Sequence, residues 1–359
     1  MARLRETLEN RVDGLLYLPD FRCRCVKCNA VKAAIEHIIC DVNRLYTNVN
    51  TDEVLRAASA HLARYQECTD RSEVTVMRTQ KVHGYAGGNI YNRGASVTFT
   101  LQEAYDLLVF GTMCRIFWVG DTLIQQVLGI PMGGHLSKIM VSILLCSYER
   151  DLFTDRSWLK ANGFYPNAFA IRNIHPTSLF HGIRHVDDAL IFSRVFCSSC
   201  LLKLMHHAYK APLEVSLEGS GPRAEFLDTV VTRQGTKLRL RLFQKNELWA
   251  LRQSDTIVKH NLPPVLGKPC ITMRRVTAYL SVKFHRIHQL HPWGDPARLQ
   301  CVVVLALEIH RLGYSLPFMR RAANRLRHKN ICDMAHAFVP IFSYMTNRPS
   351  VESSVPPFR

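Results

Sequence analysis

The sequence contains no uninterrupted apolar run of the roughly 18 residues that a transmembrane helix needs, which argues against a membrane-spanning chain. Its first ten residues, MARLRETLEN, are charged and hold no apolar stretch, so no secretory signal peptide is visible. No segment is repeated along the chain. We therefore expect a nuclear or cytoplasmic protein that is neither secreted nor held in a membrane, although no localisation signal stands out.

Acidic residues are scarce relative to basic ones: 29 Asp and Glu stand against 46 Lys and Arg, which gives a formal net charge of +17 at pH 7. Apolar residues make up 47% of the 359 residues, enough for two or three packed units, so disorder is not the default expectation. A balance this basic suits a polyanionic partner, most simply nucleic acid held through its phosphates. The alternative is a protein that is merely basic.

The chain has 12 cysteines, but neither of its short cysteine groups is followed at a convenient distance by the second pair that zinc sites usually have. These groups are Cys23, Cys25 and Cys28 in FRCRCVKC, and Cys197 and Cys200 in CSSC. Without a secretory route, cysteines are kept reduced rather than built into disulfides. We therefore favour plain reduced thiols in both groups, with metal binding as the alternative for each.

Periodicity predicts a mixed α/β chain with an α-rich C-terminal third. A helix is expected to begin with Thr51 as its N-cap, followed by Asp52 and Glu53 in the first turn. Further helices are predicted to begin at residues 101, 136 and 198, and the region from about 265 to 345 is predicted to be helical. Residues 80–100 predict a loop or an exposed hairpin. Further hairpins are expected after the helix that begins at residue 101 and around residues 234–235, and the tail of residues 346–359 is expected to be disordered.

Asp187 and Asp188 stand side by side in RHVDDALIFS, a stretch that predicts a strand, a sharp corner and a second strand. Two adjacent carboxylates repel each other, and burying either one without a partner is costly. Asp41 ends a separate short apolar run, Ile38 to Cys40. If the two strands are neighbours in one sheet, the three carboxylates converge at one edge. The alternative is a set of acids that only favour turns.

Mg²⁺ fits such a cluster, because this ion takes one or two carboxylates and completes its shell with water and substrate phosphates. Two such ions, roughly 4 Å apart, activate an attacking oxygen and stabilise the leaving oxygen in a displacement at phosphorus. A basic protein with a two-metal acidic cluster therefore points to nucleotidyl transfer on nucleic acid.

Four sequence blocks around these acids resemble those of reverse transcriptases, most closely the Penelope-like branch. The block that starts at Asp41, DVNRLYTNVN, resembles D-V-x-S-L-Y-T-N-I-P, and the block that starts at Gly129, GIPMGGHLSK, resembles G-x-P-M/Q-G-S-P-L-S-P. The block that starts at Arg184, RHVDDAL, resembles R-Y-V-D-D-I-L, and the run Phe226–Asp228 matches a downstream F-L-D. All four occur in the order of the family.

The resemblance implies a right-hand polymerase fold of the α/β (α+β) class. Its parts would be residual fingers or an N-terminal extension (1–35), a palm with a fingers insertion (36–245) and an α-helical thumb-like region (246–345). It further implies an RNA-directed DNA polymerase that extends a primer 3′-OH with dNTPs. The partners would be an RNA template and a DNA or RNA primer, and the cofactors two Mg²⁺ ions, with Mn²⁺ as a substitute.

The resemblance also assigns the residues of the metal site. Asp41, Asp187 and Asp188 would be the catalytic and metal-binding acids, and the backbone carbonyl of Val42 would complete a metal shell. The structural alternative for the acids is a set of turn and capping residues.

Three further residues would contact the substrate. Tyr46 looks like the family's steric gate, a ring under the sugar that leaves no room for a 2′-hydroxyl; the alternative is an aromatic side chain packed beneath a loop. Met132 and Gly133 resemble the segment that lies against the incoming nucleotide and the template base. The alternative for that segment is a bend that starts a helix.

The chain departs from the family pattern in several places. Gly134, His135 and Lys138 replace the expected Ser-Pro and second Pro, and His185 replaces a Tyr. Only 40 residues precede Asp41, fewer than the family's fingers region. These departures favour one rival, a truncated or inactive retroelement-derived nucleic-acid-binding protein. A second rival is an RNA polymerase of the same palm type, against which Tyr46 argues.

The C-terminal third is rich in arginine. If it is a thumb, the resemblance suggests that its arginines reach phosphates of the nucleic acid, and the alternative is a solvated basic helix face. The residues concerned are Arg320, Arg321, Arg325 and Arg327.

Overall fold

The computed structural model describes residues 11–15, 25, 35–77, 96–113, 115–132, 134, 136–154, 176–235, 237–251, 272–291, 294–326 and 331–347. The predicted disordered tail lies outside these residues from position 348 on. The chain divides into two compact units between Gly221 and Pro222, with residues 11–13 grouped with the second unit. Each unit is described by itself.

The first unit holds three small sheets and five of the described α-helices. Its elements are β1 (Glu36–Asn43), α3 (Leu45–Asn48), α4 (Thr51–Thr69), β2 (Glu73–Met77), β3 (Ser96–Thr100), α5 (Leu101–Met113), β4 (Ile116–Val119), β5 (Thr122–Gln125), α6 (Ser137–Thr154), a 3₁₀ turn (Pro176–Ser178), β6 (Phe180–His185), β7 (Asp188–Ser193), α8 (Ser198–Ala208) and β8 (Glu214–Ser220). The mixed α/β prediction is therefore confirmed for this unit.

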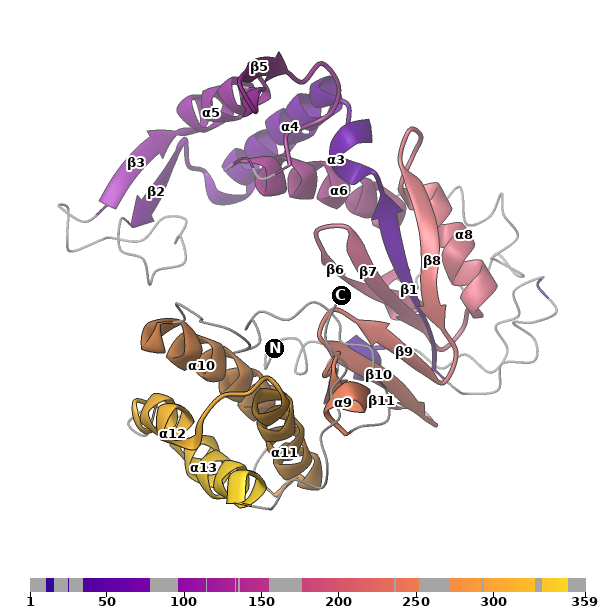
Figure 1. Ribbon diagram of the computed structural model, residues 1–359. Coiled ribbons are helices and arrows are strands. Elements are labelled where there is room, and N and C mark those ends of the chain that lie inside the picture. The colour runs from indigo at the N-terminus through magenta and orange to yellow at the C-terminus, as the bar shows by residue number, and fades with distance from the viewer. Residues whose placement is uncertain are drawn as a thin grey trace. The chain divides into compact units, whose positions relative to one another are not determined.

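The central sheet of the first unit has four antiparallel strands in the order β6-β7-β1-β8 (Figure 1). β6 and β7 form the hairpin predicted around the Asp187–Asp188 corner. β1, which is distant from them in sequence, is inserted between β7 and β8. The prediction that the two Asp-bearing strands are neighbours in one sheet is thus confirmed.

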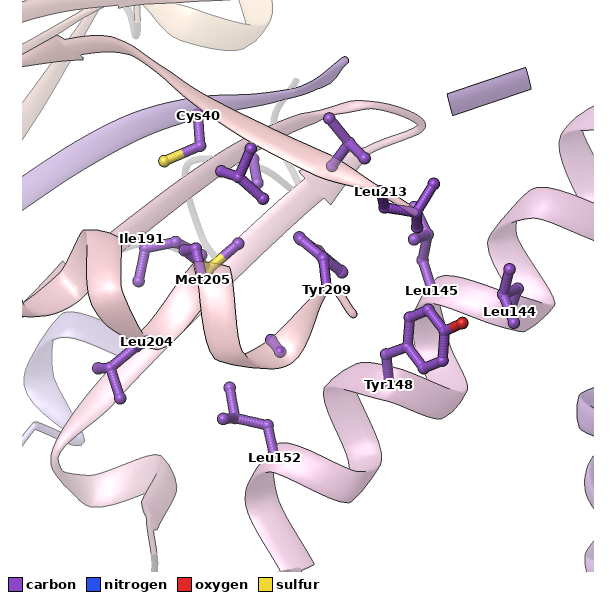
Figure 2. Close-up of a cluster of buried hydrophobic side chains, with 14 of the residues drawn as sticks. Cys40, Leu144, Leu145, Tyr148, Leu152, Ile191, Leu204, Met205, Tyr209 and Leu213 are labelled. Carbon is purple, nitrogen blue, oxygen red and sulfur yellow. The ribbon is translucent and has the colours of Figure 1, made fainter. Parts of the chain in front are cut away.

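One face of this sheet packs against α6 and α8. Alternate residues of β1 and β7, among them Cys40 and Ile191, join the same buried cluster as Leu145 of α6 and Met205 of α8. Figure 2 shows these side chains filling the space between the strands and the two helices. Because successive side chains of a strand point to opposite faces, the residues between them lie on the other face of the sheet. That face carries Asp41.

The helix α4 begins one residue earlier than the sequence indicated. The side chain of Asn50 accepts a hydrogen bond from the backbone N–H of Asp52 at 2.9 Å, so Asn50 is the N-cap and Thr51 is the first helical residue. Asp52 and Glu53 lie in the first turn, as predicted. Both Asn and Thr are good N-cap residues, and an N-cap residue has a non-helical backbone. Asn50 is extended, with φ −79° and ψ 119°, and so takes this position.

Two further hairpins flank α5. β2 pairs with β3, so residues 96–100 of the predicted loop or exposed hairpin form a strand, while residues 80–95 lie outside the described residues. β4 pairs with β5 as predicted. The β4–β5 hairpin presents apolar side chains to solvent, since Trp118 and Leu123 are 68% and 54% exposed.

The second unit combines a three-stranded sheet with a helical cluster. Its elements are β9 (Arg223–Phe226), β10 (Thr229–Gln234), β11 (Lys237–Leu242), α9 (Glu247–Ala250), α10 (Met273–Leu290), α11 (Pro296–Arg311), α12 (Leu316–Asn324) and α13 (Cys332–Asn347). The hairpin predicted around residues 234–235 is confirmed as β10–β11, and the predicted helical region is confirmed where the structure describes it.

In the core of the second unit, the β10–β11 hairpin packs against the helices. Leu242 of β11 belongs to the same buried cluster as Phe284 of α10 and Phe338 of α13. Phe338 stacks on Phe342 with ring centroids 5.6 Å apart. The resemblance to reverse transcriptases implied a palm of residues 36–245 that includes this hairpin, whereas in the structure the hairpin packs on the helices that follow it. None of the described helices is both long and apolar enough to cross a membrane.

Candidate catalytic site

The register of the central sheet brings Asp41 and Asp188 together. Asp41 of β1 lies directly across from Asp188, the first residue of β7. Directly opposed residues of an antiparallel pair have neighbouring side chains on the same face of the sheet. This is the face opposite α6 and α8, because Cys40 and Ala189, the pair one position along, belong to the helix-packed cluster. Two carboxylates therefore share one position at the sheet edge.

The hairpin corner adds the third carboxylate. His185 pairs with Asp188, so Val186 and Asp187 form a two-residue turn. The turn is tied to the central strand, because the backbone N–H of Val42 donates to the carbonyl of Asp187 at 3.1 Å. Asp187 is thus held beside β1, one position from the Asp41–Asp188 pair.

Val186 adopts a backbone conformation that is unfavourable for its side chain. Its φ is +61°, in the left-handed region where a two-residue hairpin of this kind usually has glycine. A β-branched residue in this region is strained by about 1–3 kcal/mol, and such strain persists only where the surroundings hold the chain in place.

An arginine from the preceding strand provides this support. Arg184 donates to the carbonyl of Val186 at 3.1 Å and forms an ion pair with Glu149 of α6 at 2.5 Å. Tyr209 donates its hydroxyl hydrogen to the same carboxylate at 2.7 Å. The strained corner is therefore clamped to α6 and to the C-terminal end of α8.

The surroundings of Asp41 disfavour the ionised form of this residue. Burial raises the pKa of Asp41, and the neighbouring carboxylates of Asp187, Asp188 and Glu218 raise it further, while the backbone N–H of Val42 lowers it. Glu218 lies on β8, where a register irregularity falls between the partners of Ile39 and Cys40. Sequence reasoning missed Glu218, because nothing in EVSLEGS reveals that this strand pairs with β1.

The chemistry of these acids suits a divalent cation. Carboxylate oxygens are the ligands that Mg²⁺ prefers, and an ion would remove the repulsion that raises the pKa of Asp41. The three predicted acids, Asp41, Asp187 and Asp188, are brought together as expected. A role of the Val42 carbonyl as a ligand stays a prediction.

Tyr46 lies beside the acids. It belongs to the short helix α3, is 9% exposed, and has a raised pKa because of burial and of the nearby carboxylate of Asp187. Tyr46 also belongs to the buried cluster beneath the sheet. It is therefore both a packed aromatic residue and a neighbour of the acids. Its predicted role as a sugar gate stays a prediction.

The second sequence block docks on the first through a glycine. Gly129 has φ +73°, and a Cβ built on it would lie 2.2 Å from the carbonyl oxygen of Tyr46 and 2.8 Å from the backbone of Thr47. The next residue, Ile130, donates its backbone N–H to the same Tyr46 carbonyl at 2.7 Å. Only glycine permits this approach, since any other residue meets backbone atoms that cannot move aside.

The rest of the second block leads into α6. Ser137, the first residue of that helix, donates its hydroxyl hydrogen to the carbonyl of Pro131 at 2.6 Å. Met132 is 79% exposed, so its side chain is accessible to a ligand. Gly133 lies outside the described residues, and the nucleotide contacts of both residues stay predictions.

The fourth block belongs to the second unit. Asp228 belongs to the second unit, in the turn between β9 and β10, and its carboxylate forms an ion pair with Arg286 of α10. The neighbouring residue Leu227 has φ +56°. The F-L-D run therefore marks a tight turn that is tied to a helix of its own unit.

No family model and no curated protein matches the chain. Comparison with solved structures gives matches of low identity. Two of the matched structures are telomerases. Apo telomerase from Candida tropicalis matches with a TM-score of 0.46 and 11% identity, over 95% of this chain and 50% of that one. Telomerase from Candida albicans in complex with a TWJ fragment of telomeric RNA matches with a TM-score of 0.44 and 13% identity, over 95% of this chain and 52% of that one. The chain thus spans about half the length of the telomerases it matches.

Replacing Gly129 by alanine should disrupt the contact between the first two blocks. Two costs add: about 1 kcal/mol for an alanine with positive φ, and about 2 kcal/mol for the clash with Tyr46 and Thr47. Gly120→Ala is the matched control, because Gly120 has φ +60° and its added Cβ would have no neighbour within 4 Å. Chemical unfolding of both variants measures the difference, and equal destabilisation would contradict the docking described above.

Asp41→Asn should stabilise the metal-free protein at neutral pH. Because the pKa of Asp41 is raised, the folded state binds this proton more tightly than the unfolded chain does, so stability is lost as the pH rises through the folded pKa. The melting temperature of the variant in a chelator should exceed that of the wild type at neutral pH, with the gap closing at about pH 4, near the unperturbed pKa.

Asp151→Asn is the control for Asp41→Asn, since the Asp151 side chain is 48% exposed near the end of α6. It should leave the melting temperature unchanged. A lower melting temperature for Asp41→Asn than for the wild type at neutral pH would rule out a net destabilisation by ionised Asp41.

Proposed function

We propose that this chain is the polymerase part of a reverse transcriptase, an RNA-directed DNA polymerase that extends a primer 3′-OH with dNTPs. The observation that carries the proposal is the direct pairing of Asp41 with Asp188 beside the clamped Asp187 turn. The three acids come from two sequence blocks that resemble the family, and a third block docks on Tyr46 next to them. On this proposal the palm lies within residues 36–245, of which β9–β11 pack with the helices of the second unit. Residues 246–345 are thumb-like, and the sequence motifs favour the Penelope-like branch.

The acids supply the metal-binding part of the mechanism. When two Mg²⁺ ions are bound, Asp41, Asp187 and Asp188 would hold them with the carbonyl of Val42, and the ions would supply the positive charge that activates the primer hydroxyl and stabilises the leaving pyrophosphate. The sheet fixes Asp41 and Asp188 before any ligand arrives, and the Arg184 clamp fixes the turn. Such preorganisation lowers the cost of orientation during the reaction.

Tyr46 would set the choice of sugar. It lies in the short helix α3 that follows β1, and Gly129 and Ile130 contact its backbone, which would limit movement of the ring away from the nucleotide. A fixed ring beneath the sugar of the nucleotide would exclude a 2′-hydroxyl by contact. This favours DNA synthesis over the RNA polymerase alternative.

Basic residues would hold the template and primer. The net charge of +17 favours phosphate binding. In the second unit Arg320 and Arg321 are exposed on α12, and Arg325 is exposed just after it. Arg327 lies outside the described residues. Phosphate contacts from this helix would bind nucleic acid without reading its sequence.

The deciding experiment is primer extension on an RNA template with Mg²⁺ and dNTPs. Asp187→Asn combined with Asp188→Asn should reduce extension by about 1,000-fold, because metal-assisted charge stabilisation contributes several kcal/mol. Asp151→Asn is the control and should extend like the wild type. Binding of the same primer–template is recorded in parallel. Binding without extension in the wild type would favour the rival, an inactive nucleic-acid-binding protein.

Tyr46→Ala should relax the choice between deoxy- and ribonucleotides. We expect the wild type to prefer dNTPs, and the variant to lose about tenfold or more of this preference in kcat/KM, the scale on which one steric contact discriminates. Tyr46→Phe keeps the ring and should keep the preference. A wild-type preference for ribonucleotides would refute the gate, and an unchanged ratio in Tyr46→Ala would leave the ring as a packing residue.

A further inference from the structure

In the first unit, three cysteine sulfurs lie close together although their residues are not all close in sequence. The Sγ atoms of Cys25, Cys197 and Cys200 all lie within 4.8 Å of one another. Those of Cys25 and Cys197 are 3.9 Å apart, although the two residues are separated by 172 positions. Cys197 and Cys200 are buried, and Cys25 is half-buried.

These distances fit a metal ion better than a disulfide. A tetrahedral Zn²⁺ ion with Zn–S bonds of about 2.3 Å places its sulfurs about 3.8 Å apart. A disulfide requires about 2.05 Å between sulfurs and joins only two of them. The sulfurs of Cys25 and Cys197, 3.9 Å apart, have the spacing of two ligands of one zinc ion, and the third sulfur lies within 4.8 Å of both.

The local backbone of the CSSC pair supports the same reading. Cys197 is the N-cap of α8, and its carbonyl accepts from the backbone N–H groups of Cys200 and Leu201 at 3.0 and 2.9 Å. Both thiols thus lie at the positive end of a helix dipole, which favours the thiolate form that binds metal. The two-residue spacing is that of a zinc-binding pair.

We propose that Cys25, Cys197 and Cys200 are ligands of one structural Zn²⁺ ion. Each sequence group lacks a second pair nearby, which argued against a metal site when each was considered alone. The fold supplies the missing partner from the other group. This inference is independent of the proposed polymerase activity.

The zinc ion would link the segment before β1, which holds Cys25, to the turn after β7, which leads to Cys197. That turn is already rigid: Ser193, the last residue of β7, accepts on its hydroxyl from the backbone N–H groups of Val195 and Phe196 at 2.9 and 3.0 Å, and donates to the carbonyl of Leu179 at 2.6 Å. Cys197 follows directly. A zinc ion here would join the chain segments that lead into and out of the two strands carrying Asp41 and Asp188.

Metal analysis of the full chain purified under reducing conditions tests the site. We expect about one zinc per chain, and Co²⁺ substitution should give the visible bands of a tetrahedral ion with thiolate charge-transfer absorption from three or four sulfurs. Chelation should lower the melting temperature by about 5 °C or more. Cys25→Ala should lose the metal and the cobalt spectrum while keeping its far-ultraviolet circular dichroism, because Cys25 is the least buried of the three.

Cys68→Ala is the matched control, since Cys68 is exposed at the end of α4 and should leave zinc content and melting temperature unchanged. Folded wild-type protein without zinc and without a tetrahedral cobalt spectrum would overturn the proposal. So would wild-type zinc content in Cys25→Ala, stoichiometric iron in place of zinc, or a Cys25–Cys197 disulfide in metal-free protein.

Discussion

The antiparallel pairing of β1 with β7 is the constraint on which the candidate site depends. This register places Asp41 opposite Asp188 and, at the next position, binds the turn of Asp187 to Val42. A shift of one residue would turn Asp41 towards the helices and move Cys40 to the opposite face of the sheet. The apolar side chains that pack on α6 and α8 oppose such a shift. The hydrophobic face of the sheet therefore holds the acidic face in register.

Stability and chemistry oppose each other at this sheet edge. Burial and the neighbouring carboxylates raise the pKa of Asp41, and Val186 is held with a positive φ. Neither feature stabilises the metal-free fold. Both are compensated nearby: Arg184 binds the turn carbonyl and Glu149, and the sheet beneath is fully packed. Local strain that is supported by well-packed surroundings is typical of functional sites.

Backbone contacts join segments that a linear reading treats as separate motifs. Gly129 and Ile130 meet the backbone of Tyr46 and Thr47, so the second block supports the turn that follows the first acid. Similarly, Cys25 meets the CSSC pair at the start of α8. In both cases short or small residues permit the approach. Together these contacts hold the elements around the acids from two sides.

The sequence by itself determined the identity of the three acids, the corner at Asp187, the β10–β11 hairpin and the helices of the C-terminal third. These features are local, because hydrophobic alternation, helical periodicity and turn residues within a short stretch of sequence are enough to predict them. Only the tertiary structure decided which strands are neighbours, and therefore that Glu218 adds its charge to Asp41 and that Asp228 ties a turn to Arg286 instead. It also brought Cys25 to Cys197. Partners so distant along the chain leave no periodic signal, since their meeting depends on how whole sheets and helices pack.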